Sequence, residues 1–206
     1  VNDTGHFVSA SWGDYDNDGY LDLFVAHNGS QNFLYQNNGD GTFKKITKGA
    51  IANVSSYAVV GLWADYDNDG YLDLYVVNGW FSALKNFLYR NDGSGSFTKI
   101  TEGAIVNDQE GSTGGSWGDY DNDGDLDLYV TNSLNESKNS LYKNNGNGTF
   151  VKITEGAIVN YNGASVGSSW IDYDNDGDLD LFVINSHGQK NSLFQSMGDG
   201  TFSQMT

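Results

Sequence analysis

The phrase Asp-x-Asp-x-Asp-Gly-x-x-Asp occurs four times in this chain of 206 residues and constrains its fold more than any other feature. A tryptophan stands two residues before each copy, at Trp12, Trp63, Trp117 and Trp170, so the periods are 51, 54 and 53 residues. A period near 50 residues is typical of a propeller blade or a similar stacked unit. We therefore expect one repeat domain of four blades, with approximate limits at residues 1–49, 50–103, 104–156 and 157–206.

Each repeat is predicted to form four short antiparallel strands, which in the first repeat cover about residues 8–15, 20–27, 32–37 and 42–47. Asn-Gly or Asp-Gly pairs between the third and fourth strands supply the positive φ that tight hairpins need. Small residues fill the first strand, which suits an innermost position where blades crowd around an axis. No stretch shows convincing helical periodicity. The sequence thus predicts an all-β fold of propeller blades, with the Asp-rich loop between the first and second strands.

The four Asp-rich loops have the composition of calcium sites. Ca²⁺ takes about six to eight oxygen ligands, and positions 1, 3, 5 and 9 of each loop supply carboxylates. Glycine at position 6 permits a sharp turn, and position 7 offers its backbone carbonyl. Mg²⁺ retains more of its waters, and Zn²⁺ prefers nitrogen and sulfur. We predict four Ca²⁺ ions held by Asp14, Asp16, Asp18, Tyr20 and Asp22; by Asp65, Asp67, Asp69, Tyr71 and Asp73; by Asp119, Asp121, Asp123, Asp125 and Asp127; and by Asp172, Asp174, Asp176, Asp178 and Asp180.

The alternative is that these loops are solvated acidic turns that bind nothing. Four carboxylates within nine residues repel one another strongly without a cation, and the pattern occurs four times, so we favour metal binding. The ligand set leaves no obvious open position for a substrate. We therefore expect the calcium to be structural.

The net charge of −17 is concentrated in the loops. Sixteen of the 27 acidic residues stand at the four carboxylate positions, and the other 11 are nearly balanced by 10 Lys and Arg. The chain has no basic patch, which argues against a nucleic-acid partner. It has no cysteine and no apolar run near the ~20 residues of a membrane-spanning helix, so we expect neither disulfides nor membrane insertion. Because it begins at Val1 without a signal peptide, we expect a processed or excised piece.

Two phrases, residues 119–128 (DYDNDGDLDL) and 139–146 (NSLYKNNG), resemble the FG-GAP or VCBS repeat family. This family forms the calcium-bearing blades of integrin α-subunit propellers, of some fungal lectins and of many bacterial surface proteins. The resemblance covers essentially the whole chain and implies an extracellular or cell-surface module for adhesion or for protein or glycan interaction. Family propellers usually have about seven blades, whereas this chain encodes four. We therefore expect further repeats or self-association.

The face opposite the calcium loops carries the loops that vary most between repeats, so we expect any protein or glycan partner to bind there. Trp80, Phe81 and Tyr161 are the candidate ligand-binding residues, with packing between blades as the alternative. No acid–base pair is evident outside the calcium loops, so we do not predict an enzyme. The other functional hypotheses are a structural subunit of a larger fibre, ring or surface assembly, and a carbohydrate-binding lectin.

Overall fold

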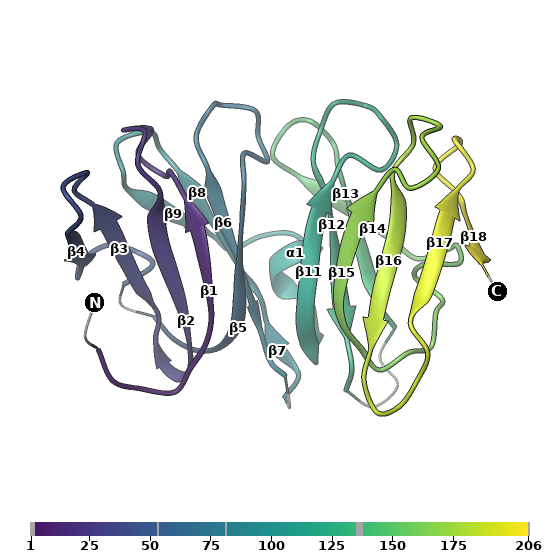
Figure 1. Ribbon diagram of the computed structural model, residues 1–206, viewed down its shortest axis with the longest axis horizontal. Coiled ribbons are helices and arrows are strands. Elements are labelled where there is room, and N and C mark those ends of the chain that lie inside the picture. The colour runs from purple at the N-terminus through teal and green to yellow at the C-terminus, as the bar shows by residue number, and fades with distance from the viewer. Residues whose placement is uncertain (1–2, 53, 81, 135–137, 206) are drawn as a thin grey trace.

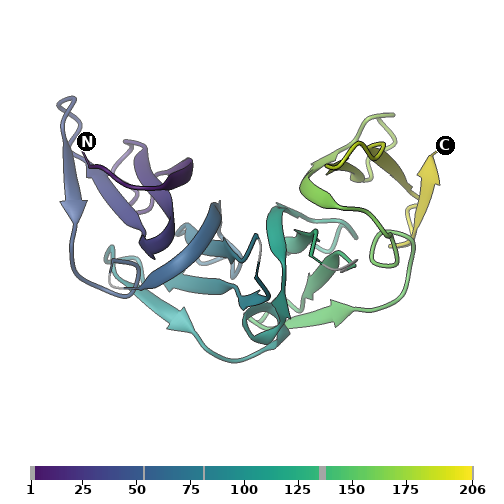
Figure 2. The same ribbon diagram turned by 90° about the horizontal axis from the view of Figure 1, so that it is seen from below.

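The computed structural model describes residues 3–52, 54–80, 82–134 and 138–205. Four antiparallel blades stand side by side along an arc, and the two ends of the chain lie at the two ends of that arc (Figures 1 and 2). The arc is open, as Figure 2 shows from below. This arrangement confirms the prediction of an all-β chain built from propeller blades.

Each blade contains four main strands in chain order, as predicted. The first blade has β1 (Phe7–Gly13), β2 (Asp22–Gln31), β3 (Phe33–Asn37) and β4 (Phe43–Ile46). The second has β5 (Ser55–Ala64), β6 (Asp73–Asn78), β8 (Phe87–Asn91) and β9 (Phe97–Ile100). The third has β11 (Ser112–Gly118), β12 (Asp127–Asn132), β13 (Ser140–Asn144) and β14 (Phe150–Ile153). The fourth has β15 (Ser165–Ile171), β16 (Asp180–Asn185), β17 (Ser192–Ser196) and β18 (Phe202–Met205).

Three local features depart from the regular repeat. Strand β2 continues beyond the predicted end at residue 27, and its last residues pair with β5 of the second blade, with Gln31 opposite Ser55. Strands β7 (Leu84–Lys85) and β10 (Gln109–Glu110) form a separate two-stranded sheet. A single helical turn, α1 (Ala104–Asn107), links the second and third blades. Four residues are too few to show helical periodicity, which explains why the sequence did not predict this turn.

The core lies between neighbouring blades, where aromatic rings from two repeats stack. A tyrosine from each of the first three Asp-rich loops packs on the tryptophan of the next blade, and ring pairs of this kind contribute beyond their buried area. The pairs are Tyr15 and Trp63, Tyr66 and Trp117, and Tyr120 and Trp170, with ring centroids 6.3, 6.4 and 6.3 Å apart. Each blade is therefore stabilised largely by its neighbours, as expected for stacked repeats.

The first strands of neighbouring blades contact each other on the concave side of the arc (Figure 2). Their small side chains permit this approach: the Ser116 and Ser168 hydroxyls lie 2.8 Å apart, and Thr113 Oγ1 donates to the Ser165 carbonyl at 2.6 Å. A Cβ added to Gly114 would lie 3.0 Å from the Val166 carbonyl oxygen. The structure thus places the small-residue strands innermost. Within the described residues, no helix has the length and hydropathy to cross a membrane.

Candidate metal centre

Each Asp-rich loop connects the first strand of a blade to its second strand, as β1 and β2 show in the first blade. The chain turns back within the loop because two residues adopt positive φ. Asn17 at position 4 has φ of 56°, a region that asparagine tolerates better than most residues, and Gly19 at position 6 has φ of 89°. The same two positions have positive φ in the other three loops. This turn directs the carboxylates at positions 1, 3 and 5 towards one another.

Backbone amides hold the carboxylates of loop positions 1 and 5 in place. In the first blade, Asp14 accepts hydrogen bonds from the amides of Asp18 at 3.1 Å and Gly19 at 2.9 Å. Asp18 accepts one from the amide of Tyr20 at 2.9 Å. The same three bonds occur in each of the other loops. The carboxylates are therefore oriented by the loop itself, and each oxygen retains a lone pair for a metal ion.

The ninth position is the first residue of the second strand, and its side chain is buried in all four blades. Asp22 accepts hydrogen bonds from the amides of Tyr15 at 3.1 Å and Asn37 at 2.7 Å. Burial raises the pKa of Asp22 to about 6, because the amide bonds only partly offset the loss of solvent and the other loop carboxylates add repulsion. Burial likewise raises the pKa of Asp73 and of Asp127 to about 7. A bound cation would favour the charged form that burial disfavours.

Oxygens from three aspartates of every loop converge within 4.8 Å of one another. Each group includes the carboxylates of positions 1 and 3 together with position 5 or position 9. The groups are Asp14, Asp16 and Asp18; Asp65, Asp67 and Asp73; Asp119, Asp121 and Asp127; and Asp172, Asp174 and Asp180. Among the residues that the structure describes, four groups could therefore hold a metal ion.

The aspartate at position 3 gives the strongest evidence that a metal ion fits the loop. One oxygen, Oδ1, of Asp16, of Asp67 and of Asp121 is buried and has no hydrogen-bond partner. An unsatisfied buried carboxylate oxygen costs free energy that a native protein seldom leaves uncompensated. Because Asp16, Asp67 and Asp121 each belong to a converging group, a hard cation at the centre of the loop would satisfy this oxygen. The donor set is entirely oxygen, which suits Ca²⁺ better than Zn²⁺.

The side chains of position 7 have contacts outside their own loops, while the role of this position's carbonyl stays a prediction. In the third blade, Asp125 Oδ1 accepts a hydrogen bond from Asn68 Nδ2 of the second blade at 2.8 Å. In the fourth blade, Asp178 Oδ1 accepts one from Asn122 Nδ2 at 2.7 Å. The ring of Tyr20 is exposed. The loop asparagines thus connect each site to the next, a role that sequence reasoning missed although an asparagine occupies position 4 in all four copies.

Trp80 and Tyr161, the two candidate ligand-binding residues that the structure describes, line different pockets. Trp80 lines a cleft of about 350 Å³ formed mainly by the innermost strands, with Leu62 and Val166 among its other residues. The Tyr161 hydroxyl accepts hydrogen bonds from Asn185 Nδ2 at 2.6 Å and from a serine of β17, and the ring borders a separate pocket. Phe81 lies outside the described residues. Tyr161 therefore packs within the fourth blade and also faces a pocket.

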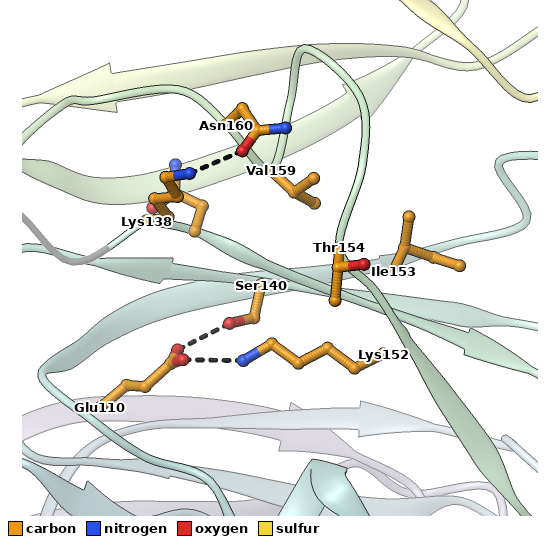
Figure 3. A pocket seen from close by; sticks show the side chains of 9 residues that line it. Glu110, Lys138, Ser140, Lys152, Ile153, Thr154, Val159 and Asn160 are labelled. Carbon is orange, nitrogen blue, oxygen red and sulfur yellow. Dashed lines mark hydrogen bonds and ion pairs between the residues drawn. The ribbon is translucent and has the colours of Figure 1, made fainter.

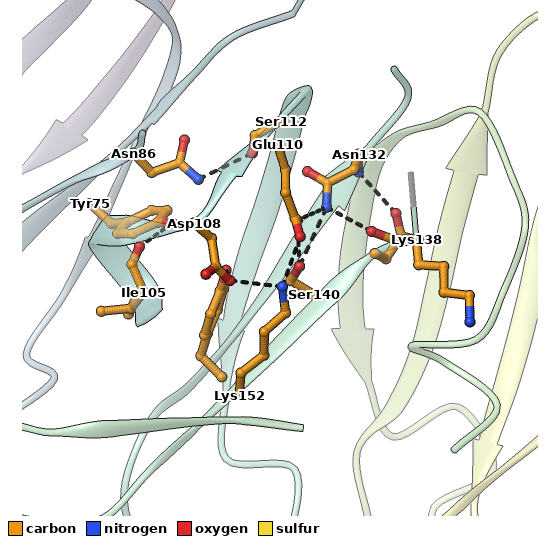
Figure 4. Close-up of polar contacts among 12 residues, drawn as sticks. Tyr75, Asn86, Ile105, Asp108, Glu110, Ser112, Asn132, Lys138, Ser140 and Lys152 are labelled. Atoms are coloured by element: carbon orange, nitrogen blue, oxygen red, sulfur yellow. Dashed lines mark hydrogen bonds and ion pairs between the residues drawn. The ribbon is translucent and has the colours of Figure 1, made fainter. Parts of the chain in front are cut away.

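A polar cluster near α1 is a further feature that the sequence did not indicate. The Lys152 ammonium lies 2.7 Å from carboxylate oxygens of both Asp108 and Glu110 (Figure 4). Glu110 also accepts hydrogen bonds from Ser140 Oγ at 2.6 Å and from Asn132 Nδ2 at 2.5 Å. The cluster borders a pocket of about 330 Å³ (Figure 3), which Lys138, Thr154 and Asn160 also line. The Lys152 ammonium bridges the two carboxylates and so connects β14 to β10 and the residue before it.

The repeat matches a known protein family. The model of the FG-GAP-like repeat matches residues 14–76, 78–130, 131–183 and 172–206. The chain belongs to the FG-GAP-like repeat family. This result confirms the resemblance inferred from the sequence, while the exact blade limits stay a prediction, since the matched segments overlap and begin at a different phase of the repeat.

Among curated proteins, this FG-GAP-like chain is similar to cartilage acidic protein 1. It is 28% identical to the Xenopus tropicalis protein over 176 residues, covering 82% of the chain and 27% of that protein. It is also 28% identical to the human protein over 186 residues, covering 82% of the chain and 26% of that protein. The chain therefore spans about a quarter of the length of the curated relatives it matches.

Solved structures share the fold of the FG-GAP-like chain at low sequence identity. One is a lectin from Agrocybe aegerita that recognises non-reducing terminal N-acetylglucosamine, with a TM-score of 0.64, 18% identity, and coverage of 98% of this chain and 52% of the lectin chain. Another is BBS1N in complex with ARL6DN, with a TM-score of 0.59, 13% identity, and coverage of 98% and 57%. These likenesses establish the fold alone.

Proposed function

We propose that this chain is a calcium-stabilised β-propeller module that binds a protein or glycan outside the cell. The observation that carries the calcium proposal is the buried, unpartnered Oδ1 atom of Asp16, Asp67 and Asp121. Each lies among converging carboxylates, so an ion there would satisfy it. The predicted ligands all come from one loop, and that loop links two strands of a blade. We therefore propose a structural role for the ion.

Terbium luminescence tests the calcium proposal. Tb³⁺ resembles Ca²⁺ in its preference for oxygen ligands, and aromatic side chains near a site can sensitise its emission. Each loop has a tyrosine at position 2, which in three blades stacks on a tryptophan. We expect strong sensitised emission that added Ca²⁺ abolishes and that Mg²⁺ barely affects. Emission that Ca²⁺ fails to displace would contradict the proposal.

The face opposite the Asp-rich loops supports the interaction proposal. Two pockets there are lined by residues that stand 53 positions apart in the chain, such as Lys85 and Lys138, and Asn107 and Asn160. In both pockets the lysine donates to the asparagine, at 2.8 and 2.7 Å respectively (Figure 3 labels Lys138 and Asn160). A recurring pocket of amides, hydroxyls and apolar side chains has the chemistry to hold a sugar or a polar peptide segment.

A glycan array with the calcium-loaded chain separates the two kinds of partner. The lectin that shares this fold recognises N-acetylglucosamine, which makes a carbohydrate the first ligand class to test. Binding that is lost on Asn160→Ala and retained on Trp80→Ala would place a glycan in this pocket. An array without binding would favour a protein partner or a structural subunit of a larger assembly.

We place the protein in an extracellular or cell-surface setting. Extracellular calcium modules typically bind at about 10⁻⁴–10⁻³ M, a concentration that cytosol does not reach. A measured dissociation constant below about 0.1 µM would remove this argument, because such sites fill inside cells as well.

We further propose that the module associates with additional blades, either in further repeats or in a second copy. The fourth-blade tyrosine, Tyr173, is 39% exposed, whereas its equivalents Tyr15, Tyr66 and Tyr120 are at most 6% exposed. Trp12, at the other end of the arc, is 54% exposed. The two open flanks thus present the two halves of the stacking contact that joins neighbouring blades.

A further inference from the structure

One position on the third strand of each blade faces the Asp-rich loop and differs in charge between blades. Gln36 and Gln195 occupy it in the first and fourth blades, whereas Arg90 and Lys143 occupy it in the second and third. The aspartates at positions 1, 3, 5 and 9 are the same in every copy, while position 7 is tyrosine in the first two loops and aspartate in the third and fourth. Two of the four loops therefore have a positive charge beside them, and two do not.

In the first and fourth blades the side chain is a neutral donor. Gln36 Nε2 donates to Asp16 Oδ2 at 2.6 Å, and Gln195 Nε2 donates to Asp174 Oδ2 at 2.6 Å. The glutamine thus holds one oxygen of the third-position carboxylate. In the first blade the other oxygen, Asp16 Oδ1, remains buried and free for an ion.

In the third blade the same contact is an ion pair. Lys143 Nζ bonds to Asp121 Oδ2 and lies 3.3 Å from Asp123 Oδ2, so one ammonium contacts two of the carboxylates that would hold an ion. The side chain of Asp121 is 16% exposed and that of Lys143 is 34% exposed, so water screens the pair only in part. Asp121 Oδ1 remains buried without a partner, as in the first blade.

We propose that Lys143 is a built-in counter-cation that makes the third loop the weakest of the four calcium sites. The inference rests on the proposed calcium function and adds that the four sites fill at different calcium concentrations. A divalent ion entering this loop meets a fixed positive charge a few ångströms away, which reduces the Coulomb attraction of the carboxylates. Without calcium, the same ammonium relieves repulsion between Asp121 and Asp123. The third blade therefore depends less on calcium for its structure than the first and fourth blades do.

The second loop should have an intermediate affinity for calcium. Arg90 is exposed and makes no hydrogen bond to Asp67 within the part of the chain that the structure describes. Its charge acts through solvent, where screening weakens it. We expect the first and fourth loops to bind calcium most tightly, the second less tightly, and the third least.

Four glycine amides report on the sites separately. Gly19, Gly70, Gly124 and Gly177 each donate to the first carboxylate of their own loop, at 2.9 to 3.1 Å. Calcium is added in steps to protein labelled with ¹⁵N-glycine, and amide shifts give one half-saturation concentration for each loop. In the wild-type chain the Gly124 amide should respond at the highest calcium concentration.

Variants that exchange lysine and glutamine test whether the Lys143 charge causes the weaker calcium binding of the third loop. Lys143→Gln should lower the half-saturation concentration at Gly124 by about tenfold, and Gln36→Lys should raise that at Gly19 by a similar factor. Lys190→Gln removes the same charge from the connection between β16 and β17 and should leave Gly124 unchanged. The Gln36→Lys arm also tests the inference if Lys143→Gln fails to fold.

The amide responses distinguish a failure of this inference from a failure of the calcium function. If all four amides respond to calcium but neither Lys143→Gln nor Gln36→Lys changes a half-saturation concentration, this inference is overturned and the calcium function stays intact. The same holds if Lys190→Gln changes the Gly124 response as much as Lys143→Gln does. If none of the four amides responds to calcium, the calcium function fails, and this inference fails with it.

Discussion

The phenol ring of Tyr66 stacks on the indole of Trp117 in the next blade, with ring centroids 6.4 Å apart and ring planes inclined by 12°. The same contact joins the first blade to the second and the third to the fourth. Each loop tyrosine therefore links a candidate metal site to the packing between blades. Loss of an ion from one loop should weaken the junction with the following blade.

The open ends of the arc predict self-association of the isolated chain. Tyr173 of one copy should stack on Trp12 of another, because both rings are exposed and their equivalents pair in this way at every internal junction. Light scattering with calcium present should give a mass that rises with concentration above 22.4 kDa. Trp12→Ala should reduce this rise, and Tyr57→Ala, which removes an exposed ring away from this junction, should not. A monomer at every concentration would contradict the prediction.

Calcium removal should lower the thermal stability of the chain. With free calcium at about 100 times the dissociation constant, each occupied site stabilises the folded state by roughly 2.7 kcal/mol. Four such sites would contribute on the order of 10 kcal/mol, which is comparable to the stability of a whole domain. Melting curves followed by circular dichroism should therefore shift down by many degrees in EDTA, and added calcium should restore them. Identical curves with and without EDTA would show that the loops contribute no metal-dependent stability.

The calcium-free chain should become less stable as the pH rises. Burial raises the pKa of Asp73 and of Asp127 from 3.8 to about 7 in the folded state, so between these values the folded chain binds protons that the unfolded chain has released. The stability contributed by these two protonated carboxyls is therefore greatest below about pH 4 and is lost as the pH rises through about 7. Calcium should oppose this trend, since it stabilises the charged carboxylates.

Denaturant unfolding at pH 5 and pH 8 checks this pH dependence. The calcium-free chain should unfold at the lower denaturant concentration at pH 8, whereas the stabilisation gained from calcium should be larger at pH 8. Asp73→Asn removes one of the two carboxylates and should weaken the trend in calcium-free protein. Greater stability of the calcium-free chain at pH 8 than at pH 5 would reverse the predicted sign.

The local features of the repeat could be predicted from the sequence, because each depends on residues that are close in the chain. The spacing of Asp14, Asp16, Asp18 and Asp22 indicated one turn that gathers carboxylates, and the structure brings oxygens of the first three within 4.8 Å. The small residues of the first strand indicated its innermost place.

Contacts between blades could not be predicted in the same way. The pairing of Gln31 with Ser55, which joins the first two blades in one sheet, depends on how the blades stack. The hydrogen bond from Asn68 to Asp125 spans 57 residues and lies outside any local pattern. Lys143 likewise stands 22 residues from Asp121, and only the hairpin between strands brings them together.

The number of calcium ions bound by the intact chain tests the central claim most directly. Calorimetry or equilibrium dialysis on calcium-depleted protein should give four ions for the wild-type chain and three for Asp121→Ala, which loses a converging carboxylate. Asp125→Ala should still bind four, because its side chain bonds to Asn68 and only its backbone carbonyl is a predicted ligand. Equal losses in both variants would contradict the ligand assignment, and a wild-type chain that binds no calcium would contradict the account as a whole.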